Sequence, residues 1–191
     1  MLLQPASGGI KPVGDLGVSP GAYTVQLSGV NNTSGVGLVE IYDLDETGSS
    51  ARLVNISSRS WVGAGGDVLI PGYVIDGDVS RTVVIRAVGP TLGTAPYNIA
   101  GVLENPTLVV HRPIEGQEAE VMGSNDDWES NANLEDLKAA FAAVGAFDLS
   151  AGSKDAAILL TLPPGAYTVT ASGVGGGTGV ALVEIYEVET Q

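Results

Sequence analysis

Short segments of this chain alternate apolar and polar residues with a period of two. Tyr23, Val25 and Leu27 alternate with threonine, glutamine and serine. Successive side chains of a β-strand point to opposite faces, so this alternation predicts a strand that buries one face. A loop rich in asparagine follows, and the apolar stretch Val36–Tyr42 then predicts a return strand. Together these segments predict a β-hairpin, opened by the turn dipeptide Pro20-Gly21.

The same kind of pattern recurs between turn signals along the rest of the chain. Glycine, proline and asparagine clusters separate short apolar runs, which is typical of strands joined by tight turns. We therefore expect an all-β protein, an antiparallel β-sandwich of Ig-like or jelly-roll-like kind. Further strands are predicted at residues 52–58, 68–75, 82–88, 107–111 and 155–162.

One segment has helical periodicity instead, at about residues 133–145. Leu134, Leu137, Phe141 and Val144 fall on one face of a helix with 3.6 residues per turn. Asn131 or Asn133 can cap its start, and Gly145 is a natural stop. We expect this short α-helix to cover one end or edge of the sheets.

The chain contains an internal duplication. Residues 20–47 align with residues 164–191 without a gap, and 16 of the 28 positions are identical. The second copy predicts a hairpin with Tyr167, Val169 and Ala171 in its first strand and 180–186 as its return strand. The spacing of 144 residues suits a repeated domain and is too long for a solenoid repeat.

The duplication divides the chain into a partial and a complete unit. We expect residues 1–48 to be an N-terminal partial repeat and residues 49–191 to be a complete β-sandwich. The second hairpin follows an apolar run at 155–162, whereas Pro12 and two glycines before the first hairpin make a central strand there improbable. An isolated hairpin is marginally stable in water, so the first hairpin must dock on its own or a neighbouring unit.

Composition and charge exclude several classes of function. The formal net charge of −14 would repel nucleic acid and anionic membrane surfaces. There are no cysteines and one histidine, so disulfides, thiol chemistry and the usual zinc sites are excluded. No apolar run approaches the roughly 20 residues of a membrane helix, and we expect neither membrane insertion nor a signal peptide in this chain.

The acidic turn Ser124–Trp128 is the best candidate for a metal site. Asn125, Asp126 and Asp127 cluster the oxygen atoms that calcium prefers, although the EF-hand pattern is absent. In the alternative interpretation these side chains bond to the local backbone of a turn. No other cofactor is expected.

The sequence contains no convincing catalytic set. Acidic pairs are inevitable among 22 carboxylates, and no nucleophile elbow accompanies the single histidine. Glu40 and Glu184 occupy equivalent strand positions, where each can face solvent or be a buried partner of an arginine; the candidates are Arg52, Arg59, Arg81 and Arg86. A sugar-stacking platform is an alternative use of the aromatic residues Trp61, Trp128, Tyr73 and Tyr97.

Several segments resemble a known kind of bacterial module. They are VNNTSGVGLVEIYDLD, ARLVNISSRSWVGAGGDVLIPGYVI, RTVVIRAVGPTL, NPTLVV, SNDDW and LPPGAYTVTASGV. This text resembles the tandem β-sandwich repeats of large exported proteins that are common in Verrucomicrobia and neighbouring phyla. The resemblance implies export, an extracellular or cell-surface location and no assigned catalytic residues.

These observations favour a non-catalytic structural protein, a subunit of an extracellular fibre, filament or surface layer. A hairpin without local partners can complete the sheet of another subunit by strand addition, so self-polymerisation is expected. The residues expected to mediate assembly are Tyr23, Val25, Leu27, Val39, Ile41, Tyr167, Val169, Val183 and Ile185. The alternatives are a polysaccharide-binding or calcium-dependent adhesion module, and an accessory domain of a secreted enzyme.

Overall fold

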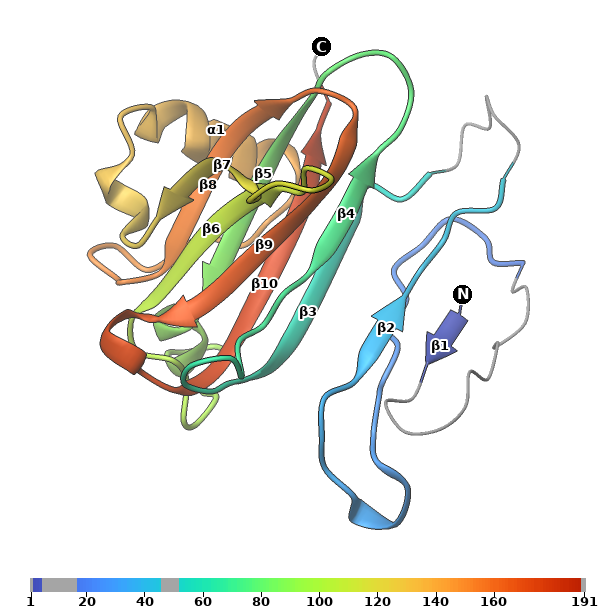
Figure 1. Ribbon diagram of the computed structural model, residues 1–191. Helices are drawn as coiled ribbons and strands as arrows, with labels where there is room; N and C mark the ends of the chain where they lie inside the picture. The colour runs from blue at the N-terminus through green and yellow to red at the C-terminus, as the bar shows by residue number, and fades with distance from the viewer. Residues whose placement is uncertain (1, 5–16, 46–51, 190–191) are drawn as a thin grey trace. The chain divides into compact units, whose positions relative to one another are not determined.

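The computed structural model describes residues 2–4, 17–45 and 52–189 (Figure 1). The chain divides into two compact units, Met1–Leu53 and Val54–Gln191, and each is described by itself below. The boundary expected from the sequence lies between residues 48 and 49. The segment around Pro12, where no central strand was expected, lies outside the described residues.

The larger unit is a β-sandwich of two four-stranded sheets, in which all named strands pair antiparallel. This confirms the expected fold class. The first sheet has the order β3-β10-β5-β8 and the second the order β4-β9-β6-β7. The strands of the first sheet are β3 (Asn55–Val62), β10 (Gly179–Val188), β5 (Arg81–Val88) and β8 (Ala156–Leu162). Those of the second are β4 (Gly72–Ile75), β9 (Gly165–Gly173), β6 (Pro106–Arg112) and β7 (Glu120–Asn125).

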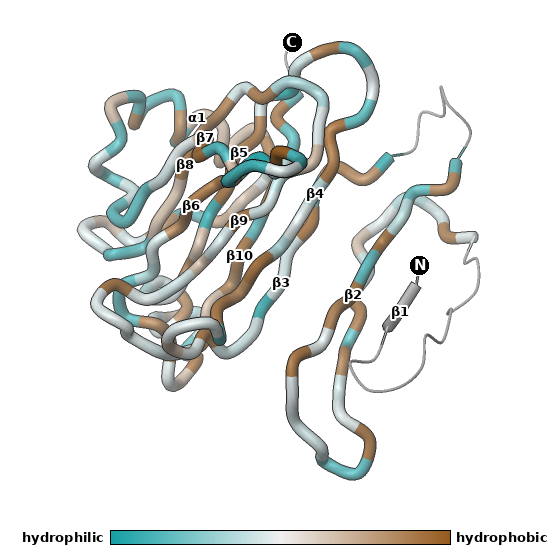
Figure 2. The backbone as a smooth tube through the Cα atoms, viewed as in Figure 1, coloured by the Kyte–Doolittle hydropathy of each residue, from teal (hydrophilic) through white to brown (hydrophobic). Residues whose placement is uncertain are grey.

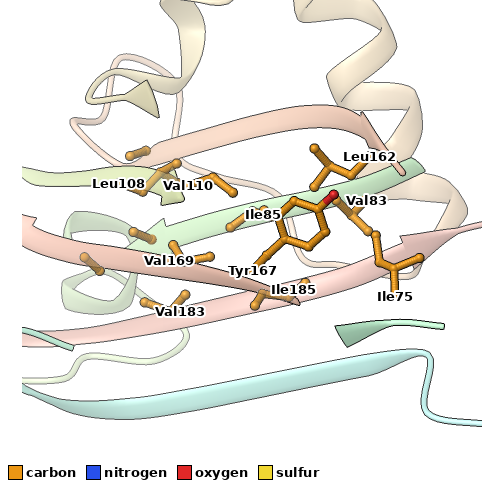
Figure 3. Close-up of a cluster of buried hydrophobic side chains, with 13 residues drawn as sticks. Ile75, Val83, Ile85, Leu108, Val110, Leu162, Tyr167, Val169, Val183 and Ile185 are labelled. Carbon is orange, nitrogen blue, oxygen red and sulfur yellow. The ribbon is translucent and has the colours of Figure 1, made fainter. Parts of the chain in front are cut away.

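The main core lies between the two sheets (Figure 3). Val83 and Ile85 of β5 point inward together with Val183 and Ile185 of β10, as the period of two requires. Tyr167 of β9 is 1% exposed and enters this core from the opposite sheet. β9 and β10 belong to different sheets and do not pair with each other, so the ladder expected between the two arms of this hairpin is wrong. The hairpin instead contributes one central strand to each sheet and connects the two layers.

A second apolar layer covers the outer face of the β3-β10-β5-β8 sheet. The even-numbered residues Val84 and Val88 of β5 point into it, and Leu137 and Phe141 of helix α1 (Leu134–Ala143) pack against them. The expected helix is confirmed, but it covers a sheet face and not an end. Gly145 ends it with a φ of +67°, a conformation that favours glycine.

The expected side-chain cap of this helix is absent. Asn133 is the N-cap residue but makes no side-chain capping bond. The amide of Asn131 instead donates to the carbonyl oxygens of Trp128 and Ala157, at 2.7 and 2.9 Å. The described residues also include four 3₁₀ turns, η1 (Val30–Asn32), η2 (Pro90–Gly93), η3 (Trp128–Ser130) and η4 (Val174–Gly176).

Some strand boundaries differ from the sequence-based expectations. The strand expected at 52–58 runs as β3 from Asn55 to Val62, because its pairing with β10 continues to the glycine turn at 63–66. The strand expected at 68–75 is regular only as β4, preceded by an isolated bridge between Leu69 and Ala171. Strand β7 was not expected.

The N-terminal unit has much less regular pairing. Its strands are β1 (Leu2–Gln4) and β2 (Leu38–Glu40), which pair antiparallel. The strand expected around Tyr23–Leu27 is not formed, since no other described segment pairs with it. Apolar positions nevertheless recur along this unit, as they do along β9 and β10 (Figure 2). The same sequence pattern thus forms a ladder only where neighbouring strands are present.

No helix among the described residues has both the length and the apolar character needed to cross a membrane.

Candidate assembly surface

The N-terminal hairpin reproduces the local geometry of the β9–β10 hairpin. The hydroxyl of Tyr23 donates to the carbonyl oxygen of Ser19 at 2.6 Å. At the equivalent place, the hydroxyl of Tyr167 donates to the carbonyl oxygen of Pro163 at 2.7 Å. Each contact fixes the entry into the first arm of its hairpin. The tyrosine contact is therefore the same in both copies, although only the second copy forms a strand there.

The turns of the two hairpins also match. Asn31 and Asn32 have φ angles of 55° and 58°, and their counterparts Gly175 and Gly176 have 65° and 80°. Asparagine is among the few non-glycine residues that tolerate this left-handed region. The backbone N–H after each turn donates to the residue that opens it, at 3.2 Å in both copies. The loop sequences differ, but the turn is retained.

The environment of the two hairpins differs sharply. Tyr23 is 62% exposed while Tyr167 is 1% exposed. Ile41 is 39% exposed while its counterpart Ile185 is 4% exposed. In the sandwich, β9 lies between β4 and β6, and β10 lies between β3 and β5. In the N-terminal unit, the only described partner strand is β1. The N-terminal hairpin therefore presents the side chains of a sandwich core without the strands that would cover them.

This contrast separates the nine residues that the sequence analysis grouped as assembly residues. Those of the second hairpin are buried in the core of their own sandwich: Tyr167, Val169, Val183 and Ile185. Those of the first hairpin are wholly or partly exposed: Tyr23, Val25, Leu27, Val39 and Ile41. Only the residues of the first hairpin are available for contacts outside their own unit.

The inner faces of the two N-terminal arms fit each other. A Cβ atom on Gly37 would collide with the side chain of Leu27. The equivalent residues of the second hairpin are Ala171 and Ala181. In the first hairpin the larger Leu27 takes the place of Ala171, and Gly37, which lacks the methyl group of Ala181, leaves room for it. The N-terminal hairpin has its own internal packing.

An arginine–glutamate pair stabilises the second hairpin from its outer face. Arg86 of β5 and Glu184 of β10 lie directly opposite each other and are both buried. The guanidinium Nε donates to Glu184 at 3.0 Å, and another guanidinium nitrogen donates to the carbonyl oxygen of Phe147. The guanidinium also lies over the rings of Phe141 and Phe147, at 4.9 and 4.3 Å. Of the interpretations considered for Glu184, the buried partner of an arginine is confirmed.

Tyr186 completes this group. Its hydroxyl donates to the second carboxylate oxygen of Glu184 at 2.7 Å. Burial, and then the hydrogen bond to Glu184, raise the pKa of Tyr186 above its ordinary value, so the phenol stays neutral and keeps donating. Arg86, Glu184 and Tyr186 are thus bonded to one another within the fold, and this group stabilises the sandwich.

Glu40 is the counterpart of Glu184 but has no arginine. The hydroxyl of Tyr42 donates to it at 3.0 Å, as Tyr186 does to Glu184. That hydrogen bond is the main cause that raises the pKa of Tyr42. No arginine or lysine is paired with Glu40 among the described residues. The N-terminal hairpin thus carries half of the ionic arrangement that is complete in the sandwich.

The proposed calcium ligands take part in a bonded turn. The side-chain amide of Asn125 accepts from the backbone N–H of Ala157 at 2.9 Å and donates to the carbonyl oxygen of Asp127 at 3.1 Å. Asp127 binds Lys154 at 2.7 Å, and this hydrogen bond raises the pKa of the lysine. Asp126 is exposed beside them. Among the described residues, no group of three or more acidic or histidine side chains is arranged to hold a metal ion.

The four aromatic residues considered for sugar stacking do not share one environment. Trp128 is buried beneath helix α1 and contacts Phe141. Tyr73 stacks on Tyr167 against the core between the sheets. Trp61 on β3 and Tyr97 are the exposed ones.

The β3–β4 side of the sandwich was not singled out from the sequence. β3 and β4 are the edge strands on the same side of the two sheets, and Figure 1 shows them running along one side. Exposed apolar side chains lie on these strands or just before them: Trp61 on β3, Val74 on β4, and Ile70 two residues before β4. The serine-rich run Ser57–Ser60 of β3 was the available signal, because a central strand rarely carries so many polar residues.

No family model matches the chain, and no curated relative matches it. Among solved structures, the chain is similar to the pre-peptidase C-terminal domain of a collagenase from Bacillus anthracis. The identity is 14%, the match covers 69% of this chain and 89% of that one, and the TM-score is 0.38. It is also similar to a protein from Sulfurospirillum deleyianum, with 9% identity, 73% and 100% coverage and a TM-score of 0.35. At these values neither likeness supports a statement about function.

Proposed function

We propose that this protein is a non-catalytic structural subunit of an extracellular fibre or surface layer, which assembles through β-strand pairing between subunits. One observation carries the proposal: a hairpin that is the centre of a sandwich at residues 164–188 is repeated at 20–44 with its core side chains exposed. The extracellular location rests on the resemblance to exported repeat proteins.

Exposed apolar surface is the driving force for this assembly. Burying a large aliphatic or aromatic side chain gains about 1.5–3 kcal/mol. The N-terminal hairpin exposes several such side chains together, and the backbone of its first arm pairs with no described strand. Pairing with another sheet would satisfy both, as strand addition does in known peptide recognition.

The buried acids support a structural role over a catalytic one. Glu184 is neutralised by Arg86. Asp155 accepts hydrogen bonds from the backbone N–H groups of Gly89 and Thr91 and from the hydroxyls of Thr91 and Ser153. Both carboxylates are thus bonded to groups of the fold itself, which supports a structural role for them.

Sedimentation velocity and electron microscopy of the purified full chain test the proposal. We expect concentration-dependent polymers, and we expect the variant Leu38→Ser/Ile41→Ser to lose them. Two lost apolar contacts of about 1.5 kcal/mol each weaken association about a hundredfold. The matched control Val121→Ser/Val174→Ser removes exposed apolar side chains of the other unit and should still polymerise. Uniform monomers of the wild-type chain at high concentration would contradict the proposal.

A further inference from the structure

The proposed function does not say which surface of another chain the N-terminal hairpin binds. Comparing the number of hairpins with the number of positions for them in the sandwich excludes one possibility. Each chain has two similar hairpins but only one place between β3 and β5, and between β4 and β6, for such a hairpin. If the N-terminal hairpin of another chain replaced β9 and β10, the displaced hairpin would be exposed instead. Exchange therefore buries no additional surface, and the hairpin needs a different partner.

The two open edges of the sandwich offer such a place. β3 forms its ladder with β10 and β4 with β9, and no other described strand pairs with their outer edges. At the other end of the first sheet, by contrast, the main chain of β8 is bonded by side chains. Ala157 donates to Asn125 and accepts from Asn131, both at 2.9 Å. The β8 edge is thus partly occupied at Ala157, whereas no described strand pairs with the outer edge of β3.

We propose that the N-terminal hairpin of one chain adds to the β3–β4 edge of a second copy, extending each sheet by one strand. This inference rests on the proposed function. The hairpin shares its turn and its tyrosine contact with β9–β10, whose two arms already pair with β4 and β3. Moving such a hairpin sideways by two strand positions, about 10 Å, brings its first arm beside β4 and its second beside β3. Both new ladders are then antiparallel.

The residues that this displacement brings together are compatible. Ile185 lies opposite Ile56, so its counterpart Ile41 meets Ile56 from the other edge. Tyr167 lies opposite Tyr73, so Tyr23 meets Tyr73. Apolar side chains of the hairpin thereby continue the core between the sheets.

Charge is complementary in the same alignment. Glu184 lies opposite Ser57, so Glu40 also lies opposite Ser57, with Arg59 diagonal to it on the same face. A diagonal neighbour is within reach of long side chains. Arg59 is the only charged residue of β3 and makes no ion pair with a described residue. It would supply Glu40 with the cation that Arg86 supplies to Glu184.

This contact joins two different surfaces, the hairpin of one chain and the sandwich edge of the next. A heterologous contact of this kind repeats from copy to copy and produces an open filament. It also covers exposed strand edges that could otherwise pair non-specifically with other chains and cause aggregation.

Disulfide trapping tests the alignment, because the chain has no cysteine of its own. One chain carries Val39→Cys and a second chain carries Ser58→Cys, the pair expected to lie opposite each other. We expect the two chains, mixed and oxidised, to form a cross-linked heterodimer as the main product. Val39→Cys mixed with Val121→Cys on β7 is the control and should not cross-link above background.

The outcomes separate the two proposals. Polymers of the wild-type chain without the 39–58 cross-link would overturn the edge contact while leaving the structural function intact. Dimers of Val39→Cys with itself would instead show hairpins pairing with each other. Absence of any polymer would overturn both.

Charge reversal gives a second readout that does not depend on oxidation. We expect Arg59→Glu and Glu40→Arg each to weaken association about tenfold, since each places like charges together. The double variant restores opposite charges between chains and should recover most of the wild-type affinity. If the double variant assembles no better than the single ones, Glu40 and Arg59 do not meet.

Discussion

Replacing Arg86 with methionine should lower the free energy of unfolding by about 3–5 kcal/mol, because it leaves the buried carboxylate of Glu184 without its cation. The guanidinium bonds to Glu184 and to the carbonyl oxygen of Phe147, and lies against two aromatic rings. All of these contacts are lost together. Denaturant unfolding of the full chain, followed by tryptophan fluorescence, measures the change.

Two further variants show whether the loss of stability comes from the unpaired charge of Glu184 or from the lost packing of Arg86. Arg81, on the same strand as Arg86, forms a surface pair with Glu187 of β10, and Arg81→Met should cost less than about 1 kcal/mol. Arg86→Met/Glu184→Met removes both buried charges and should regain most of the loss. If the double variant is as unstable as Arg86→Met alone, the lost packing of the arginine, and not the unpaired charge, is responsible.

Replacing Asp155 with alanine should lower the free energy of unfolding by at least about 3 kcal/mol, since several buried donors lose their acceptor at once. Asp155 is fully buried and joins the start of β8 to the turn at Gly89 and Thr91. Asp155→Asn keeps one acceptor oxygen but points an amide donor at another donor, so an intermediate loss is expected.

The exposed residue Asp148 provides the matched control for this site. Asp148→Ala should unfold within about 0.5 kcal/mol of the wild-type chain. Thermal unfolding monitored by circular dichroism compares the three variants. A wild-type melting temperature for Asp155→Ala would contradict the assignment of Asp155 as a structural anchor.

Much of the sandwich is predictable from local sequence, because its strands bury one face and alternate accordingly. β7 is an exception, since Gly123 interrupts the pattern. A Cβ at Gly123 would lie 2.8 Å from the side chain of Ile158, so packing against β8 selects glycine there. Strand propensity cannot reveal a residue that is chosen by a distant neighbour.

The candidate site shows the same limit more clearly. Tyr23 and Tyr167 lie in nearly identical local sequence, yet only Tyr167 belongs to a ladder. Strand formation depends on neighbouring strands that are distant in sequence. For Tyr167 these are β4 and β6, and both lie outside the duplicated segment. Similarly, the sequence predicts that Glu184 could be the buried partner of one of four arginines. Only the pairing of β10 with β5 identifies that partner as Arg86.

Hydrogen exchange of the backbone amides in residues 22–42 tests most directly whether this hairpin finds strand partners in other molecules. The full chain is compared below and above the concentration at which it assembles, with β9 and β10 as an internal reference. We expect slow exchange in both arms only in the assembled sample. Rapid exchange at both concentrations, or protection that is already complete in the dilute monomer, would contradict strand pairing between subunits.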